Sequence, residues 1–333
     1  MTLTQLRYIV SIADSGLNIT LAAERIHATQ PGVSKQLKQL EGELGFQLFA
    51  RKGKSLKSVT PAGQQVIARA RAILDEARSI RALAANLRGD AHGDLTVLTT
   101  HTQARFVLPS AIAAFGRKHP RVGLHLRPHG DAQIHGLFAG GQADLAIISS
   151  SGPAPLGGLA VPLYRWRRSV VVPRGHALAR LSRPLRLGDL AGQPLVSYDS
   201  SLRPESSLQQ AFQSAGMRPL FACTSSDADL IKTYVRAGLG VGVLAEMAIR
   251  PEDNRELQML DAAHLLPDCT TWLVLRRDRV LRSYTLDLVE QFAPHLDRRD
   301  LQAALSGEFE PNWPAPPHWS ELQRDAMRTH VAA

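Results

Sequence analysis

The stretch ATQPGVSKQLKQLEGELGFQLFARKGKSLKSVTPAG, residues 28–63, decides the fold of the N-terminal part of this chain. Thr29 is placed to cap a helix that has Pro31 in its first turn and that Gly45 ends. The residues that predict a core-facing side are Val33, Leu37 and Leu40. The polar residues that this spacing leaves on the outer side are Gln30, Ser34, Lys35 and Lys38.

Two shorter helical patterns precede this helix. Apolar residues recur at helical spacing from Leu3 to Ala13, and Ser15-Gly16 stop that helix. A second helix runs from Thr20 to Ile26 and leads into a short turn. This order is typical of a helix-turn-helix, whose second helix enters the major groove of DNA and donates to phosphates and base edges. The candidate DNA-binding residues on it are Gln30, Pro31, Ser34, Lys35 and Lys38; the alternative is an ordinary solvated helix face.

A basic, hairpin-like segment, ARKGKSLKSV, follows the reading helix. Its cations are Arg51, Lys52, Lys54 and Lys57. Four cations around one glycine suit phosphate contacts beside the groove, as in a wing, and we count Arg51 and Lys54 among the DNA-binding candidates. The formal charge of +9 over the 333 residues also suits an anionic partner, although a generally basic surface would give the same total.

Thr60-Pro61 begin a long helix by the rules for caps and first positions. Apolar residues repeat along it in steps of four and three: Val66, Ala70, Ile73, Ala77, Ile80, Ala84 and Leu87. Such a heptad seam fits a two-stranded coiled coil better than a helix that lies on a globular core. We therefore expect a dimer, with two reading helices that address two half-sites of double-stranded DNA.

Composition restricts the remaining classes of protein. The chain is 44% hydrophobic without an apolar run long enough to span a membrane, and Arg7 and Asp14 interrupt the N-terminus where a signal peptide would be apolar. We therefore expect a cytoplasmic protein with no membrane partner. The cysteines Cys223 and Cys269 lie far apart and lack metal-ligand spacing, so we expect no disulfide framework, no metal and no cofactor.

After a glycine-containing break at residues 89–93, the pattern changes to short apolar runs that alternate with helices. The predicted strands are Asp94–Thr100, Val122–Leu126, Asp144–Ser149, Ser169–Pro173, Pro194–Tyr198, Val241–Ala245 and Thr271–Leu275. The alternation predicts an α/β fold, long enough for two lobes with a cleft. We place the crossovers between lobes near Trp166–Val170 and Leu265–Thr270.

The segment TTHTQARFVLP, residues 99–109, lies where a strand ends and a helix begins. Thr100 and Thr102 offer hydroxyls and Gln103 an amide, beside the free N–H groups of a helix start, which suits a small anion. The alternative is that Thr102 merely caps the helix. Ser149 at a strand end and Trp166 at a crossover are further candidates for the same cleft, where open α/β sheets bind ligands.

The segment TQPGVSKQLKQLEGELGFQLFARKGKSLKSVTPAG resembles the winged helix-turn-helix of LysR-type transcriptional regulators. The runs TTHTQARF, DADLIKTYVRAGLGVGVLA and QFAPHL are similar to the CysB-like branch, which regulates cysteine biosynthesis and sulfur assimilation. This resemblance covers residues 1 to about 296 and implies a two-lobed, periplasmic-binding-protein-like effector domain. It further implies acetylserine, sulfate or thiosulfate as effector, a homotetramer and no covalent chemistry. RNA polymerase is a candidate partner of such a regulator.

Carried over by position, the resemblance implies that Thr100, Thr102, Gln103, Ser149 and Trp166 line the cleft, with Ser149 in place of the usual threonine. One segment departs from the branch. Where the branch resembles YTFGFTGRSEL, this chain has YDSSLRPESSL, residues 198–208. Arg203 then takes the place of a cleft threonine, which points to a larger or more acidic sulfur compound as the effector.

The expected organisation has four parts: residues 1–59 as an all-α winged helix-turn-helix, 60–88 as a linker helix for dimerisation, 92–296 as an α/β effector domain, and 297–333 as a tail that packs on a neighbouring subunit or is loose.

The sequence supports other functions less well. An enzyme would need a nucleophile or metal motif such as GxSxG or HExxH, which is missing, and a transport-type binding protein would need an export signal. A regulator that senses a different metabolite, such as a sulfonate or organic acid, stays open.

Overall fold

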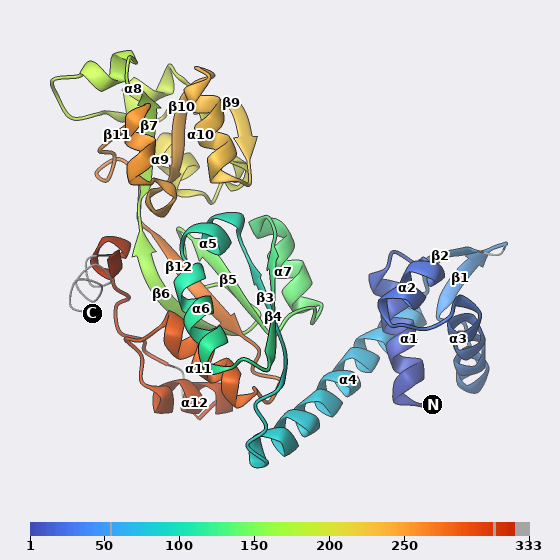
Figure 1. Ribbon diagram of the computed structural model, residues 1–333. Coiled ribbons are helices and arrows are strands. Elements are labelled where there is room, and N and C mark those ends of the chain that lie inside the picture. Colours follow the sequence, from blue (N-terminus) through green and yellow to red (C-terminus); the bar gives the residue numbers. More distant parts are fainter. Residues whose placement is uncertain (54, 309–310, 324–333) are drawn as a thin grey trace. The chain divides into compact units, whose positions relative to one another are not determined.

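The computed structural model of the protein describes residues 1–53, 55–308 and 311–323. The chain divides into two compact units, both drawn as ribbons in Figure 1. The first unit is Met1–Asp90 together with the loop Asp278–Arg282. The second unit begins at Ala91 and holds the other described residues.

Three helices open the first unit: α1 (Leu3–Asp14), α2 (Ile19–Arg25) and α3 (Gln30–Leu44). The predicted cap of α3 is confirmed, because the Thr29 hydroxyl accepts a hydrogen bond of 3.3 Å from the Gly32 N–H. Gly45 ends the helix with a φ of 77°, a left-handed conformation that glycine adopts at little cost. The core between the helices includes Leu6, Ile9, Ile12, Val33, Leu37 and Leu40.

A two-stranded antiparallel hairpin follows α3 and is made of β1 (Phe49–Lys52) and β2 (Ser55–Val59). The long helix α4 (Pro61–Leu87) comes directly after it. Thr60 caps α4 as predicted, since its hydroxyl accepts from the Gly63 N–H at 2.9 Å. Glycine is required at position 63, because a Cβ there would lie 2.0 Å from the Leu48 carbonyl oxygen. The hairpin and α4 therefore meet at a close backbone contact.

The predicted apolar seam along α4 divides into two parts. Val66 and Ala70, near its start, pack against the core of the chain's own first unit. The expectation that these turns face a partner helix is wrong, because α1 packs against this part of α4. Further along, Ile73, Ile80 and Leu87 are 42%, 62% and 80% exposed. Only this later part of the seam forms an exposed apolar row.

The second unit contains two five-stranded sheets, and each sheet is the centre of one lobe. The first lobe has the strand order β4-β3-β5-β12-β6, formed by β3 (Gly93–Thr99), β4 (Val122–Pro128), β5 (Leu145–Ser150), β6 (Leu159–Trp166) and β12 (Cys269–Leu275). The second lobe has the order β11-β7-β10-β8-β9, formed by β7 (Arg168–Pro173), β8 (Pro194–Tyr198), β9 (Leu220–Ser225), β10 (Val241–Ala245) and β11 (Leu257–Leu260). Parallel pairs such as β3–β5 and β8–β10 are typical of α/β folds.

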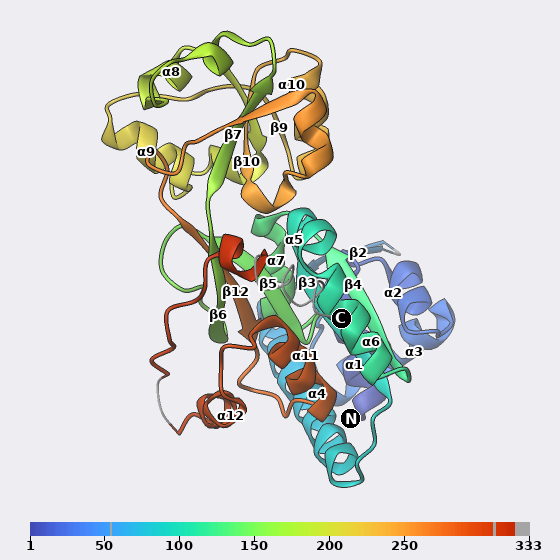
Figure 2. The ribbon, with the colours of Figure 1, turned by 60° about the vertical axis from the view of Figure 1, so that its left-hand side comes forward.

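Helices pack beside the sheets in both lobes (Figure 2). Those of the first lobe are α5 (His101–Phe106), α6 (Pro109–Lys118), α7 (Asp131–Ala139), α11 (Ser283–Phe292) and α12 (Arg298–Ser306). Those of the second lobe are α8 (Leu187–Ala191), α9 (Ser207–Ser214) and α10 (Ala228–Arg236), with the short 3-10 helices η1 (Ala177–Arg180), η2 (Asp199–Leu202), η3 (Glu246–Ala248) and η4 (Pro251–Arg255).

The chain passes between the lobes twice. At the first crossover, β6 of the first lobe ends at Trp166 and β7 of the second lobe begins at Arg168. At the second, the chain leaves β11 and enters β12 at Cys269. Both crossovers lie where the sequence predicts them. Residues near these two positions are therefore placed between the lobes.

The predicted fold class is confirmed: a winged helix-turn-helix, a long helix and a two-lobed α/β domain. The wing itself is β-structure, so the first unit is not purely helical. Sequence reasoning missed β6, β9 and β11, which all lie at the edges of their sheets. In the described part of the chain, no helix combines the length and the apolarity that crossing a membrane needs.

Candidate functional site

The outer side of α3 holds the polar residues that the sequence selects. Exposed side chains there belong to Gln30, Pro31, Lys35 and Lys38, and Ser34 is half-buried. The opposite side of the helix is buried in the core through residues such as Leu37. The helix therefore presents hydrogen-bond donors and two cations on one accessible surface.

Arg51 on β1 forms a salt bridge within its own chain. Its guanidinium lies 3.0 Å from a carboxylate oxygen of Glu41, which is 9% exposed. The other oxygen of Glu41 accepts hydrogen bonds from the backbone N–H groups of Leu48 and Phe49, at 2.8 and 3.3 Å. Arg51 therefore ties the hairpin to α3, and it has less freedom to contact a phosphate than an exposed lysine has.

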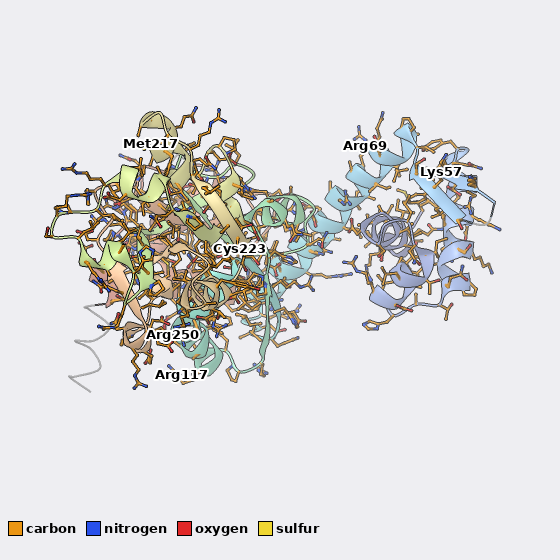
Figure 3. The ribbon with its side chains drawn as sticks, turned by 90° about the horizontal axis from the view of Figure 1, so that it is seen from above. Lys57, Arg69, Arg117, Met217, Cys223 and Arg250 are labelled. Carbon is orange, nitrogen blue, oxygen red and sulfur yellow. The ribbon has the colours of Figure 1, made fainter. Side chains whose placement is uncertain are left out.

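Lys52 and Lys57 of the hairpin are exposed, and Figure 3 shows Lys57 on this hairpin, with Arg69 on α4. Lys54 lies outside the described residues. An open hollow between α3 and the hairpin is lined by Ser34, Lys38, Glu41, Gly42, Gly45, Phe46, Gln47, Arg51 and Gly53. The donors of α3 and the hairpin thus border one continuous surface.

Thr100, and not Thr102, caps α5 in the second unit. Its hydroxyl accepts a hydrogen bond of 3.3 Å from the Gln103 N–H. The alternative that Thr102 is the cap is wrong, because β3 ends at Thr99 and the helix begins at His101. The Thr100 hydroxyl acts as an acceptor in this cap, so its own hydrogen can donate to another group; the side chain is half-buried.

Thr102 connects the two lobes. Its hydroxyl donates a hydrogen bond of 3.2 Å to the hydroxyl oxygen of Tyr198, at the end of β8. The same oxygen accepts from the Ala245 N–H at 3.3 Å. Burial raises the pKa of Tyr198, so the phenol stays neutral and keeps a hydrogen to donate.

Gln103 is 1% exposed and lies at the centre of a buried polar cluster. Its amide nitrogen donates to the hydroxyls of Thr271 and Ser149, at 3.2 and 3.4 Å, and these hydroxyls are 3.0 Å apart. Its amide oxygen accepts from the hydroxyl of Tyr164, whose pKa burial raises. The bond to Ser149 is the longest of these and is the one that a ligand oxygen would replace most readily.

The serine run at the end of β5, residues 149–151, does not act as one group. Ser149 belongs to the Gln103 cluster, whereas Ser150 accepts a hydrogen bond of 3.2 Å from the indole of Trp272. Ser151 donates to the carbonyl oxygen of Glu205 at 3.0 Å, a second bond between the lobes. Only Ser149 therefore belongs with the predicted cleft residues.

Arg168 is a buried cation at the first crossover, and it is 6% exposed. Its Nε donates to the hydroxyl of Ser207 at 2.6 Å, and one Nη donates to the hydroxyl of Ser201 at 3.3 Å. No carboxylate within the described ranges lies at ion-pairing distance from this guanidinium. The carboxyl group of Asp131 interacts with it electrostatically but forms no salt bridge with it. A buried charge that no opposite charge contacts directly is costly, so this guanidinium is suited to receive an anion.

Trp166 lies beside Arg168 and is 6% exposed. The guanidinium carbon of Arg168 is 5.9 Å from the centre of its ring. The indole N–H is buried and meets no hydrogen-bond acceptor among the described residues. Buried donors are normally paired, so a ligand acceptor would satisfy this group.

Arg203 adds a second positive charge to the cluster that contains Arg168. Burial raises the pKa of Asp131, although the positive charges of Arg203 and Arg168 act to lower it. One carboxyl oxygen of Asp131 is buried and has no hydrogen-bond partner among the described residues. The cluster therefore combines two cations with one carboxyl group that is poorly satisfied.

Sequence reasoning missed part of this cluster: Tyr164, Arg168, Tyr198 and Thr271. A signal existed only for Arg168, because it directly precedes the apolar run SVVVP, where a charge is expensive. Across the described ranges, no group of histidine, cysteine, aspartate and glutamate side chains is placed to hold a metal ion.

Comparison with known proteins relates both units to one family. Residues 3–64 match the bacterial regulatory helix-turn-helix protein, lysR family, and residues 88–297 match the LysR substrate binding domain. The HTH-type transcriptional regulator CysB of Haemophilus influenzae is 43% identical over 305 residues, which are 91% of this chain and 94% of that protein.

Two solved structures extend the comparison. The cofactor-binding domain of the Cbl transcriptional regulator is 35% identical, with a TM-score of 0.60, over 66% of this chain and 95% of that one. Full-length CbnR, complexed with its target DNA, is 25% identical, with a TM-score of 0.57, over 88% of this chain and 99% of that one. The chain belongs to the LysR family of transcriptional regulators and is a CysB-like member of it.

Proposed function

We propose that the protein is a sequence-specific DNA-binding transcriptional regulator in the cytoplasm whose activity a small anionic effector controls. The effector would come from cysteine biosynthesis or sulfur assimilation, and acetylserine, sulfate and thiosulfate are the first candidates. Similarity to CysB supports this effector class. No enzymatic step is part of this role.

The observation that carries the proposal is the buried guanidinium of Arg168, which donates hydrogen bonds to the hydroxyls of Ser201 and Ser207 and forms no salt bridge with any described residue. Hydroxyls compensate a buried cation less well than an anion does. A sulfate or carboxylate would supply the missing charge and form charge-assisted hydrogen bonds. Arg168 belongs to β7 and Ser201 to η2 of the second lobe, while Trp166 next to them belongs to the first lobe. An anion held here would contact both lobes.

The remaining shell would consist of neutral donors. Thr100 and Tyr198 can each donate a hydroxyl hydrogen, and Trp166 can donate its buried indole N–H. Thr102, Gln103 and Ser149 form the inner wall of the site. Arg203 adds a second cation, as the sequence suggested. The six residues of α5 give a weak helix dipole, so Arg168 replaces the helix end as the main positive charge.

On the DNA side, we propose that α3 lies in the major groove. Gln30, Pro31, Ser34, Lys35 and Lys38 would read base edges and adjacent phosphates. The hairpin would contact the backbone, with Lys54 and neighbouring lysines as the principal cations and Arg51 as a weaker contributor because of its pairing with Glu41.

We further propose that two chains associate through α4. The exposed row Ile73, Ile80 and Leu87 supports this, because large apolar side chains on one helix face favour burial against a second helix. A homotetramer would arise from two such dimers, and RNA polymerase is a further proposed partner. Two α3 helices could then address two half-sites of one promoter.

A binding screen tests the effector class. Purified full-length protein is heated with O-acetylserine, N-acetylserine, sulfate, thiosulfate or an alkyl sulfonate, and the unfolding temperature is recorded. A ligand that binds only the folded state raises this temperature with its concentration. We expect at least one sulfur-containing anion to do so, and chloride at equal ionic strength to have no effect.

The second candidate is a LysR-type regulator of a different metabolite, such as a sulfonate or an organic acid. The presence of Arg203 favours it, because its charge changes the cluster that includes Asp131. Stabilisation by sulfonates or dicarboxylates, with none by acetylserine, sulfate or thiosulfate, would select this candidate.

A further inference from the structure

The C-terminal segment, residues 311–323, packs along the outer edge of β6 in its own chain (Figures 1 and 2). The indole N–H of Trp313 donates to the carbonyl oxygen of Ala160 at 2.9 Å. The backbone N–H of Arg165 donates to the carbonyl oxygen of Pro317 at 2.8 Å, and Arg165 and His318 form a parallel bridge. Since β6 is an edge strand, the segment covers backbone groups that would otherwise be unpaired.

The segment also reaches the polar cluster. The ring of Trp319 lies against Tyr164, with 5.4 Å between ring centres and 47° between ring planes. Tyr164 is 3% exposed and donates its hydroxyl hydrogen to the amide oxygen of Gln103. One side chain therefore separates the C-terminal segment from Gln103.

A third contact reaches the second lobe. The Nε2 of His318 lies 3.5 Å from a carboxylate oxygen of Glu246, at the start of η3. The same oxygen accepts a hydrogen bond of 2.8 Å from the N–H of Arg167, in the first crossover. The segment thus contacts both lobes at the point where the chain passes between them.

The orientation of the Gln103 amide depends on these neighbours. An amide side chain can turn over, and its hydrogen-bond partners decide which end carries the oxygen. The hydroxyl of Tyr164 fixes the oxygen end, so the NH₂ end faces Ser149 and Thr271. Without the ring of Trp319, Tyr164 loses one of its packing surfaces, and the amide is held less firmly.

We propose that Trp319 is a positioning residue for the effector site: it holds Tyr164 against Gln103, so the C-terminal segment is needed for full effector affinity. This inference rests on the proposed function, because it takes the Gln103 cluster to be part of the effector site. It assigns the segment a role within its own chain, where the sequence suggested a neighbouring subunit or a loose tail.

Calorimetric titration of full-length variants with N-acetylserine, sulfate and thiosulfate tests this role. Trp319→Ala should weaken binding of the tightest probe by about tenfold, the scale of one lost hydrogen bond at a site. Trp319→Phe keeps a ring against Tyr164 and should bind within about threefold of the unchanged protein. Trp313→Phe, which removes the indole bond to Ala160 but leaves Trp319, is the matched control and should bind normally.

The possible outcomes separate the two proposals. If the unchanged protein binds a probe and Trp319→Ala binds it equally well, the positioning role is refuted while the effector site stands. If none of the probes binds the unchanged protein, the proposed effector class fails. The positioning role is then tested by nuclear magnetic resonance of the Gln103 side-chain amide. The side-chain NH₂ resonances of Gln103, identified by their loss in Gln103→Ala, should then shift in Trp319→Ala but not in Trp313→Phe. Unchanged resonances in Trp319→Ala would overturn the inference.

Discussion

Replacement of Lys232 by methionine should strongly destabilise the second lobe. Lys232 is 2% exposed, and its Nζ lies 2.7 Å from Asp253 and 2.9 Å from Asp229. It also donates to the carbonyl oxygen of Ala248 at 2.8 Å. Methionine keeps most of the side-chain volume but removes the charge, so the buried carboxylate of Asp253 keeps Arg236 as its only charged partner among the described residues.

The size of the effect follows from burial. Breaking a buried ion pair from one side costs ~3–5 kcal/mol. Because Arg236 still contacts Asp253, we expect the lower end of this range, ~3 kcal/mol. For a unit of this size, this loss corresponds to a fall of roughly 6–12 °C in the unfolding temperature.

The effect should also depend on pH. Burial acts to raise the pKa of Asp253, but hydrogen bonds from Lys232 and from the Arg250 N–H outweigh it and hold the pKa below its ordinary value of 3.8. A carboxylate with a lowered pKa in the folded state stabilises the fold above the ordinary pKa, and this contribution is lost as pH falls through the lowered value. The stability difference between Lys232→Met and the unchanged protein should therefore be full at neutral pH and shrink below pH 3.8.

Thermal and urea unfolding of the full-length protein measure this difference. Lys118→Met is the matched control, because Lys118 also pairs with a carboxylate, that of Asp287 at 3.0 Å, but is 54% exposed. An exposed pair contributes ~0–1 kcal/mol, so this variant should change little. If both variants lose the same stability, or if Lys232→Met loses none, the reasoning from burial is refuted.

Five further substitutions test other parts of the molecule. Fluorescence anisotropy measures DNA binding. Gln30→Ala should lose roughly 1–3 kcal/mol of binding free energy on the specific operator and little on random DNA. Lys57→Ala should weaken binding to both DNAs and lower by about one the slope of log affinity against log salt concentration. Ile80→Glu should split the dimer in light scattering without unfolding the chain, since Ile80 is 62% exposed; an unchanged assembly would place the interface elsewhere. Thr102→Val should remove the bond to Tyr198 and cost ~0.5–1.5 kcal/mol of effector binding in calorimetry, and a loss of stability alone would make that bond purely structural. Arg203→Thr should improve acetylserine binding and weaken the native effector; if neither affinity changes, Arg203 does not select the ligand.

The N-terminal elements could be predicted closely because local chemistry determines them. The cap at Thr29, the left-handed Gly45 and the Thr60-Pro61 helix start are each decided by one or two residues, and the structure has all three. The linker seam was predicted less well. Periodicity cannot tell which apolar residues the chain covers itself, and Val66 and Ala70 turn inward to the core of the first unit.

In the effector domain the central strands were predictable, whereas three of the four edge strands, β6, β9 and β11, were not. A central strand such as β10 is apolar throughout, with all its residues buried, whereas β9 mixes exposed and half-buried residues. The strand β6 contains Pro162 and has its edge covered by a segment far away in sequence. A strand edge that a distant segment covers produces no hydrophobic pattern in the strand's own sequence.

The candidate effector site likewise contains residues that the sequence indicates and residues that only the fold brings together. Thr100, Thr102 and Gln103 are adjacent in sequence, and a strand-to-helix junction draws attention to them. The surroundings of Arg168 depend on the fold, which brings Ser201 and Ser207 to its guanidinium. No spacing rule connects positions that only tertiary structure brings together.

The most direct test of the proposed anion site is calorimetric titration of Arg168→Met with the tightest probe from the binding screen. Arg167→Met is the control, since Arg167 is 47% exposed and pairs with Asp268 at 3.3 Å. We expect Arg168→Met to lose ~2 kcal/mol or more of binding, about 30-fold in affinity, with an unfolding temperature that does not fall, because a poorly compensated buried cation is removed. The control should bind as the unchanged protein does. Equal affinity in all three proteins, with a large fall in the unfolding temperature of Arg168→Met, would contradict the account and make Arg168 a structural residue.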